Sequence, residues 1–75
     1  MNKEKVKKVC IVVSKSTRSA KLKQELRLLT YLVDIGDFYS ADILATRLVS
    51  TYSNYCNYTV FNLKRLLNLI KKIKQ

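Results

Sequence analysis

The most restrictive feature of this sequence is the near absence of residues that interrupt helices. Its 75 residues include no proline and a single glycine, Gly36. Sandwiches, barrels and loop-rich folds need many turns, and turns depend heavily on these two residues. The chain is 48% hydrophobic and 27% charged, a balance typical of globular rather than disordered proteins. The sequence therefore predicts one small domain that is mainly helical.

Three segments repeat apolar residues at helical spacing. In residues 22–35 the apolar side chains fall on about half of the helix circumference, and Gly36 follows as the left-handed residue that commonly ends a helix. A second segment, 40–52, starts at Ser40, a good N-cap residue. A third, 59–74, has a broad apolar arc. Three such helices with short connections predict a compact core.

Residues 1–15 are expected to form a basic arm that leads into a short β-strand, with the helical core in residues 16–75. The run Val9–Val13 is apolar and rich in β-branched side chains, which favour strands. Since no second strand is evident, we expect pairing with the same strand of a second subunit; the alternative is that Val6–Val13 begins a helix. The polar residues in 14–19 are suited to cap the helix that follows.

The net charge of +10 is concentrated at both ends of the chain. Residues 1–24 carry eight basic side chains against one acid, a net charge of +7, and residues 61–75 carry five basic side chains and no acid. Residues 25–60 carry two basic and four acidic side chains. A field this positive attracts polyanions, so we expect two basic elements on a nearly neutral core. A basic surface that serves only solubility is the alternative.

Catalysis is not expected, because the necessary groups are missing. The chain has no histidine, the usual general base near neutral pH, and its five acids are scattered. There is no Gly-rich phosphate loop. Cys10 and Cys56 cannot form a zinc site without further ligands, and we expect free thiols, with a disulfide left open. No cofactor, metal or small-molecule ligand is expected.

No signal peptide or membrane span is expected either. Only five apolar residues, Val9–Val13, follow the first lysines, fewer than the apolar region of a signal peptide. No segment approaches the ~20 apolar residues that a bilayer requires. We therefore expect a soluble, cytoplasmic protein.

Two stretches resemble a helix-turn-helix of the winged-helix superfamily. They are residues 39–48, Tyr-Ser-Ala-Asp-Ile-Leu-Ala-Thr-Arg-Leu, and residues 58–67, Tyr-Thr-Val-Phe-Asn-Leu-Lys-Arg-Leu-Leu. Leu26–Gly36 resembles the first helix of the same core, so the resemblance covers residues 22–74. It implies a mainly α fold: a wingless three-helix core, here with a short N-terminal β-strand. It also implies a small transcriptional regulator that binds specific sequences in double-stranded DNA, with its third helix in the major groove.

The resemblance implies that side chains on the exposed side of the third helix read the bases. Asparagine suits adenine, arginine suits guanine, and phenylalanine can touch a thymine methyl group. The candidates on this helix are Asn57, Tyr58, Phe61, Lys64, Arg65 and Asn68. Phosphate contacts are expected from Lys71, Lys72, Lys3, Lys5, Lys7, Lys8, Lys15 and Arg18. The lysines could instead form a solvated face, and Phe61 could be a dimer contact.

Two alternatives to this interpretation stay open. A ribbon-helix-helix dimer fits the order of strand, helix and helix, although the side chains of Val9–Val13 cannot read base edges. A protein-interaction module that dimerises through the apolar arc of 59–74 is the alternative outside DNA binding. A homodimer is expected in the DNA-binding case as well.

Overall fold

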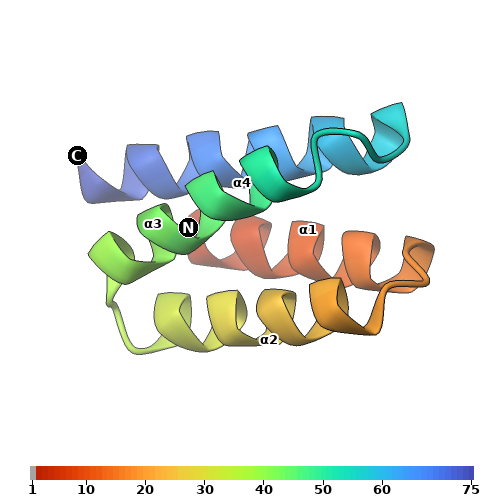
Figure 1. Ribbon diagram of the computed structural model, residues 1–75. Coiled ribbons are helices and arrows are strands. Elements are labelled where there is room, and N and C mark those ends of the chain that lie inside the picture. Colours follow the sequence, from red (N-terminus) through yellow and green to blue (C-terminus); the bar gives the residue numbers. More distant parts are fainter. Residues whose placement is uncertain (1) are drawn as a thin grey trace.

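Four helices make up most of the chain in a computed structural model, which describes residues 2–75. The helices are α1 (Asn2–Ser16), α2 (Ala20–Asp34), α3 (Phe38–Thr51) and α4 (Asn57–Lys74). They run alternately in opposite directions and form a ring in which α1 packs on α2 and α4, and α3 packs on the same two helices (Figure 1). The bundle measures 29 × 18 × 17 Å.

The predicted strand at Val9–Val13 is wrong, because this segment lies inside α1. Val6, Val9, Cys10 and Val13 recur at spacings of three, one and three, which places them on one side of a helix, and none is more than 5% exposed. A helix also satisfies its own backbone groups, whereas a lone strand needs a partner. Burial of this side thus outweighs the weak strand preference of β-branched residues.

This correction changes the fold class. Within the described residues, the N-terminal segment does not form a basic arm and a strand. It forms a helix that contributes to the core, so the bundle has four helices rather than three. Met1, the first residue of the predicted arm, lies outside the described residues. Because Val9–Val13 is helical, the predicted pairing of N-terminal strands between subunits is wrong. The ribbon-helix-helix alternative needs the same strand, so it is wrong as well.

The three helices that the periodicity predicts are all present, with ends shifted by a few residues. The Ser19 hydroxyl accepts a hydrogen bond from the Leu22 amide at 3.1 Å, which confirms that the polar residues in 14–19 cap α2. Gly36 has a φ of +80°, which confirms the left-handed residue after α2. The N-cap of α3 is Asp37 rather than Ser40: its carboxylate accepts a hydrogen bond from the Ser40 amide at 3.1 Å.

All four helices contribute apolar side chains to one continuous core. Leucines of α2, α3 and α4 make up much of it, and the small Ala41 and Ala45 bring α3 close to its neighbours. The fully buried large side chains are Val6, Val13, Leu22, Leu26, Leu29, Val33, Leu48, Leu63, Leu66 and Ile70. Among the described residues, no helix is both long and apolar enough to cross a membrane.

Candidate nucleic-acid interface

The outer side of α1 combines lysines with apolar side chains. Lys5, Lys8 and Lys15 are exposed, and so are Ile11 and Val12. They lie outside because the opposite side of the helix packs into the core through Val6, Val9, Cys10 and Val13. This sequence of residues thus builds an amphipathic helix whose exposed side is positively charged.

The predicted reading residues of α4 also lie on its outer side. The apolar arc of α4 is consumed by the core, where Leu63, Leu66 and Ile70 are buried. All eight candidate residues of this helix are exposed, and they are Asn57, Tyr58, Phe61, Lys64, Arg65, Asn68, Lys71 and Lys72. The polar side of α4 is therefore not covered by other parts of the described chain.

Nearly all of the net charge belongs to two neighbouring helices. Helix α1 carries five lysines against one glutamate, a net charge of +4, and α4 carries five basic side chains and no acid, a net charge of +5. Helix α2 has a net charge of +1 and α3 has none, because three of the five acids lie on these two helices. Because α1 packs directly on α4, one half of the bundle is strongly positive and the other nearly neutral.

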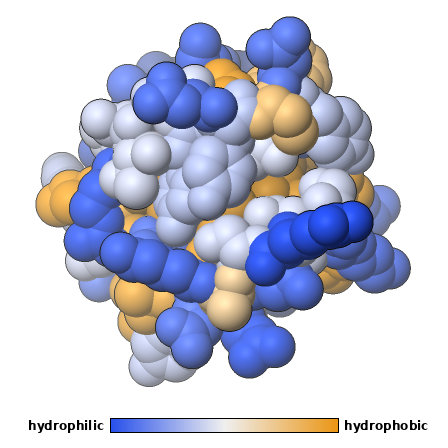
Figure 2. All heavy atoms as spheres, turned by 45° about the vertical axis from the view of Figure 1, so that its right-hand side comes forward, coloured by the Kyte–Doolittle hydropathy of each residue, from blue (hydrophilic) through white to orange (hydrophobic). Residues whose placement is uncertain are grey.

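We call the exposed sides of α1 and α4 the basic face. Its basic side chains form no ion pair with any described acid. They are Lys5, Lys8, Lys15, Lys64, Arg65, Lys71 and Lys72. Figure 2 views the bundle from the end with the α1–α2 and α3–α4 connections. Hydrophilic side chains project from this end, and hydrophobic residues are visible between them.

A groove of about 510 Å³ separates the outer sides of α1 and α4. Two aromatic side chains of α4 line it, Tyr58 and Phe61, and they are 52% and 66% exposed. The remaining lining residues are Lys5, Lys8, Val9, Val12, Asn62 and Arg65. The groove thus brings together cations from both ends of the sequence and exposed aromatic rings. That combination suits a ligand with both negative charge and flat faces.

Asn62 belongs to this groove although the sequence analysis does not select it. Its side chain is buried to 6% exposure, and its Nδ2 donates a hydrogen bond to the Tyr58 carbonyl oxygen at 2.9 Å. The signal that could have identified it is its position: it is a polar residue on the apolar arc of α4, next to Leu63 and Leu66. A buried polar side chain at such a position needs partners, and here one partner is its own helix.

Four N-terminal candidates do not line the groove: Lys3, Lys7, Lys15 and Arg18. Lys7 forms an ion pair with Asp34 of α2, and this hydrogen bond raises the pKa of Lys7. Lys3 lies over the ring of Phe38, with its Nζ 5.9 Å from the ring centre. Arg18 is exposed in the α1–α2 connection. Of the N-terminal candidates, Lys5 and Lys8 are thus the ones that line the groove.

The last lysine of α4 is also engaged within the chain. Lys74 contacts Asp42 of α3 at 2.7 Å, and its Nζ lies 4.7 Å from the ring centre of Tyr39. This hydrogen bond from Lys74 lowers the pKa of Asp42. Lys74 therefore ties the end of α4 to α3 and contributes less to the basic face than Lys71 and Lys72 do.

The two cysteines are free thiols in different surroundings. Cys10 is buried, and burial raises the pKa of its thiol to about 11. Cys56 is exposed, and a hydrogen bond with Thr59 lowers its pKa. Within residues 2–75, no group of three or more histidine, cysteine, aspartate or glutamate residues could hold a metal ion.

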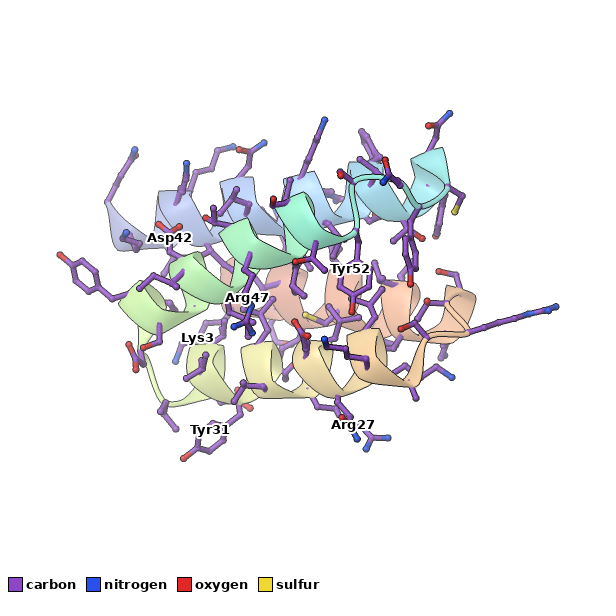
Figure 3. All side chains as sticks on the ribbon, in the orientation of Figure 1. Lys3, Arg27, Tyr31, Asp42, Arg47 and Tyr52 are labelled. Atoms are coloured by element: carbon purple, nitrogen blue, oxygen red, sulfur yellow. The ribbon has the colours of Figure 1, made fainter. Side chains whose placement is uncertain are left out.

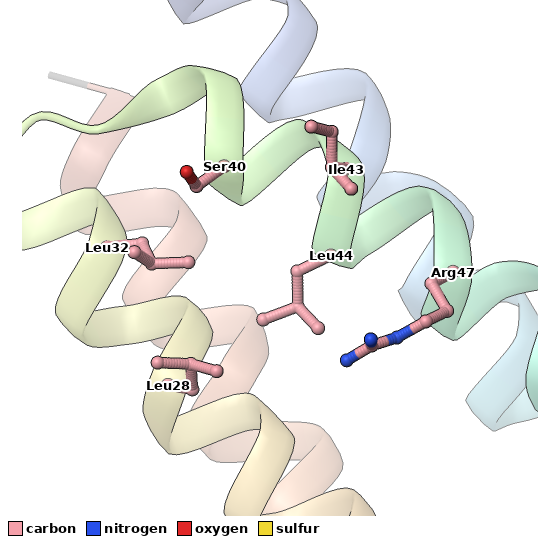
Figure 4. A pocket seen from close by; sticks show the side chains of 6 residues that line it. All are labelled: Leu28, Leu32, Ser40, Ile43, Leu44 and Arg47. Atoms are coloured by element: carbon pink, nitrogen blue, oxygen red, sulfur yellow. The ribbon is translucent and has the colours of Figure 1, made fainter.

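A second surface, between α2 and α3, has the opposite character. A groove of about 330 Å³ is lined by Leu28 and Leu32 of α2 and by Ile43 and Leu44 of α3, with Ser40 and Arg47 at its edge (Figure 4). Ile43 is 71% exposed. Figure 3 shows Tyr31 projecting from α2 away from the bundle and Arg47 between α3 and α2, where Arg47 pairs with Glu25 at 3.6 Å. This surface is apolar and nearly neutral.

Comparison with known proteins adds no relative: no family model, no curated protein and no solved structure matches this chain.

Proposed function

We propose that this chain binds DNA through the basic face. The observation that carries the proposal is the placement of nearly all the net charge on two adjacent helices, α1 and α4, whose polar sides are uncovered. Lysines and arginines that serve solubility alone have no reason to collect on one half of a bundle. Phosphates of a nucleic acid are the polyanion that such a surface attracts most generally.

The resemblance of residues 22–74 to a helix-turn-helix supports a more specific form of this proposal. In that form α4 enters the major groove of double-stranded DNA and the chain acts as a transcriptional regulator. Arg65 and Asn68 then meet base edges, while Lys71 and Lys72 meet phosphates. The free thiols Cys10 and Cys56 are compatible with a reducing compartment such as the cytoplasm.

A pair of matched double variants tests the proposal. Lys8→Gln with Arg65→Gln removes two charges from the basic face, and Lys23→Gln with Arg27→Gln removes two exposed charges from α2. Each lost phosphate contact lowers affinity roughly eightfold near 0.1 M salt, so the first variant is expected to bind duplex DNA roughly 60-fold more weakly. The second is expected to stay within about threefold of the native chain, since charges far from the interface act only through a screened field.

Fluorescence anisotropy with a labelled 20-base-pair duplex measures both affinities, and circular dichroism verifies that both variants are folded. Equal losses in the two variants would mean that the binding surface is not the basic face. Absence of binding by the native chain, even at low salt, would remove the proposal altogether.

A homodimer forms part of the proposal, and its interface is expected on α2 and α3. The apolar arc of α4 is buried within the chain, so Leu28, Tyr31, Ile35 and Ile43 supply the exposed apolar area instead. This side also has the least net charge, so two chains of +10 repel each other least when they meet here. A two-fold axis through this surface leaves both basic faces outward.

Replacing Ile43 by glutamate is expected to convert a dimer into a monomer, because it places a charge in the centre of the apolar surface. Ser53→Glu, in the α3–α4 connection, changes the charge equally and is expected to leave the dimer intact. Sedimentation velocity distinguishes the two species. A native chain that is monomeric at the highest soluble concentration would contradict the dimer.

A further inference from the structure

The groove between α1 and α4 contains a feature that charge alone does not explain. Tyr58 and Phe61 expose more than half of their surface on the most highly charged part of the molecule. Large aromatic side chains usually contribute to a core, and here the core is complete without them. An exposed ring beside cations is the arrangement on which nucleobases stack in proteins that bind single strands.

The positions of these residues define two walls of the groove. On α4, Tyr58, Phe61 and Arg65 follow one another at spacings of three and four residues, so they lie along one side of the helix. On α1, Lys5 and Lys8 lie one turn apart on the facing wall. Phosphates can run along the lysines of α1 while bases lie against the rings of α4. In a duplex the base faces are covered by neighbouring bases, so the rings have nothing to stack on.

Asn62 adds a polar group to the same groove. Its Nδ2 is committed to the Tyr58 carbonyl oxygen, and this fixes the orientation of the amide because a carbonyl oxygen accepts only from the NH2 group. The amide oxygen has no hydrogen-bond partner among the described residues, and Asn62 lines the groove. This oxygen is therefore the acceptor that the groove offers to the amino group of a base.

From these observations we propose that the α1/α4 groove holds an unpaired nucleobase stacked on Tyr58 and Phe61, so that the chain binds single-stranded DNA more tightly than duplex DNA. The inference rests on DNA binding by the basic face, and it replaces the duplex-reading form of that proposal with a preference for single strands. The lysines of α1 and Arg65 neutralise the flanking phosphates, and the rings supply the contact that paired DNA lacks.

The test compares a labelled 20-nucleotide single strand with its own duplex at the same salt concentration. The native chain is expected to bind the single strand about tenfold more tightly. Phe61→Leu is expected to weaken single-strand binding about tenfold and duplex binding less than twofold, because one stacked base is lost. Tyr39→Leu removes an aromatic ring that is 76% exposed on α3, away from the groove, and is expected to change neither affinity.

The outcomes separate this inference from the proposed function. Duplex binding that equals or exceeds single-strand binding overturns the inference and leaves DNA binding by the basic face in place. The same holds if Phe61→Leu weakens both probes equally. If neither probe binds even at low salt, both proposals are wrong. Thermal unfolding followed by circular dichroism confirms that Phe61→Leu folds, as expected for a side chain that is 66% exposed.

Discussion

Raising the salt concentration from 50 to 200 mM is expected to lower the affinity for duplex DNA by about 10³-fold or more. The reason is the release of cations from DNA when lysines and arginines neutralise phosphates, which makes the logarithm of affinity fall linearly with the logarithm of salt. The basic face carries seven basic side chains without a described ion-pair partner. Six or more phosphate contacts are therefore available to it.

The measurement is the slope of the logarithm of affinity against the logarithm of salt concentration. Anisotropy titrations at four or five salt concentrations give this slope. The double variant Lys8→Gln with Arg65→Gln is expected to reduce the slope by about two contacts, whereas Lys23→Gln with Arg27→Gln leaves it unchanged. A slope near zero would identify an apolar rather than a phosphate-binding interface. That result would favour the α2/α3 surface as the functional one.

Replacing Leu66 by alanine is expected to lower the free energy of unfolding by about 2–5 kcal/mol. Leu66 is fully buried in the centre of α4, in the core that this helix shares with α1 and α3. A domain of this size has a total stability of roughly 4–11 kcal/mol, so one such cavity removes a large part of it. Ile11→Ala, at a position that is 53% exposed on α1, removes the same number of carbon atoms and is expected to cost at most about 1 kcal/mol.

Urea denaturation followed by circular dichroism gives both values, provided that the slope with urea concentration stays the same for the two variants. Similar losses at both positions would mean that α4 is not seated in the core as described. The comparison is useful for function as well, because a loosened α4 displaces Tyr58, Phe61 and Arg65 together.

Periodicity was sufficient to predict α2, α3 and α4, because each has a clear apolar side. Ser19 and Gly36 mark the two ends of α2 as predicted, whereas Ser40 lies inside α3, which Asp37 caps. The N-terminal helix was predicted wrongly because Val9–Val13 has apolar side chains all round, so its pattern contains no period in a short window. The apolar stripe of Val6, Val9, Cys10 and Val13 becomes visible only when the window extends back to Val6 and includes Lys7 and Lys8.

The candidate side chains of α4 were predicted to be exposed, and they are. The groove could not be predicted, because it depends on contact between α1 and α4, which are separated by about half of the chain. Such contacts depend on how the four helices close into a ring, and local sequence patterns do not determine which helices pack on one another. Asn62 is different, because its position as a polar residue on the apolar arc of α4 is a local signal that the sequence does contain.

The closed ring of helices also determines when the groove comes into existence during synthesis. Its two walls come from the first and the last of the four helices, so a chain still emerging from the ribosome has only one of them. Lys5 and Lys8 are present early, but the rings of Tyr58 and Phe61 and the leucines that hold them in place arrive last. A product truncated before α4 therefore keeps the charge of α1 but lacks one wall of the groove and the core side chains that α4 supplies.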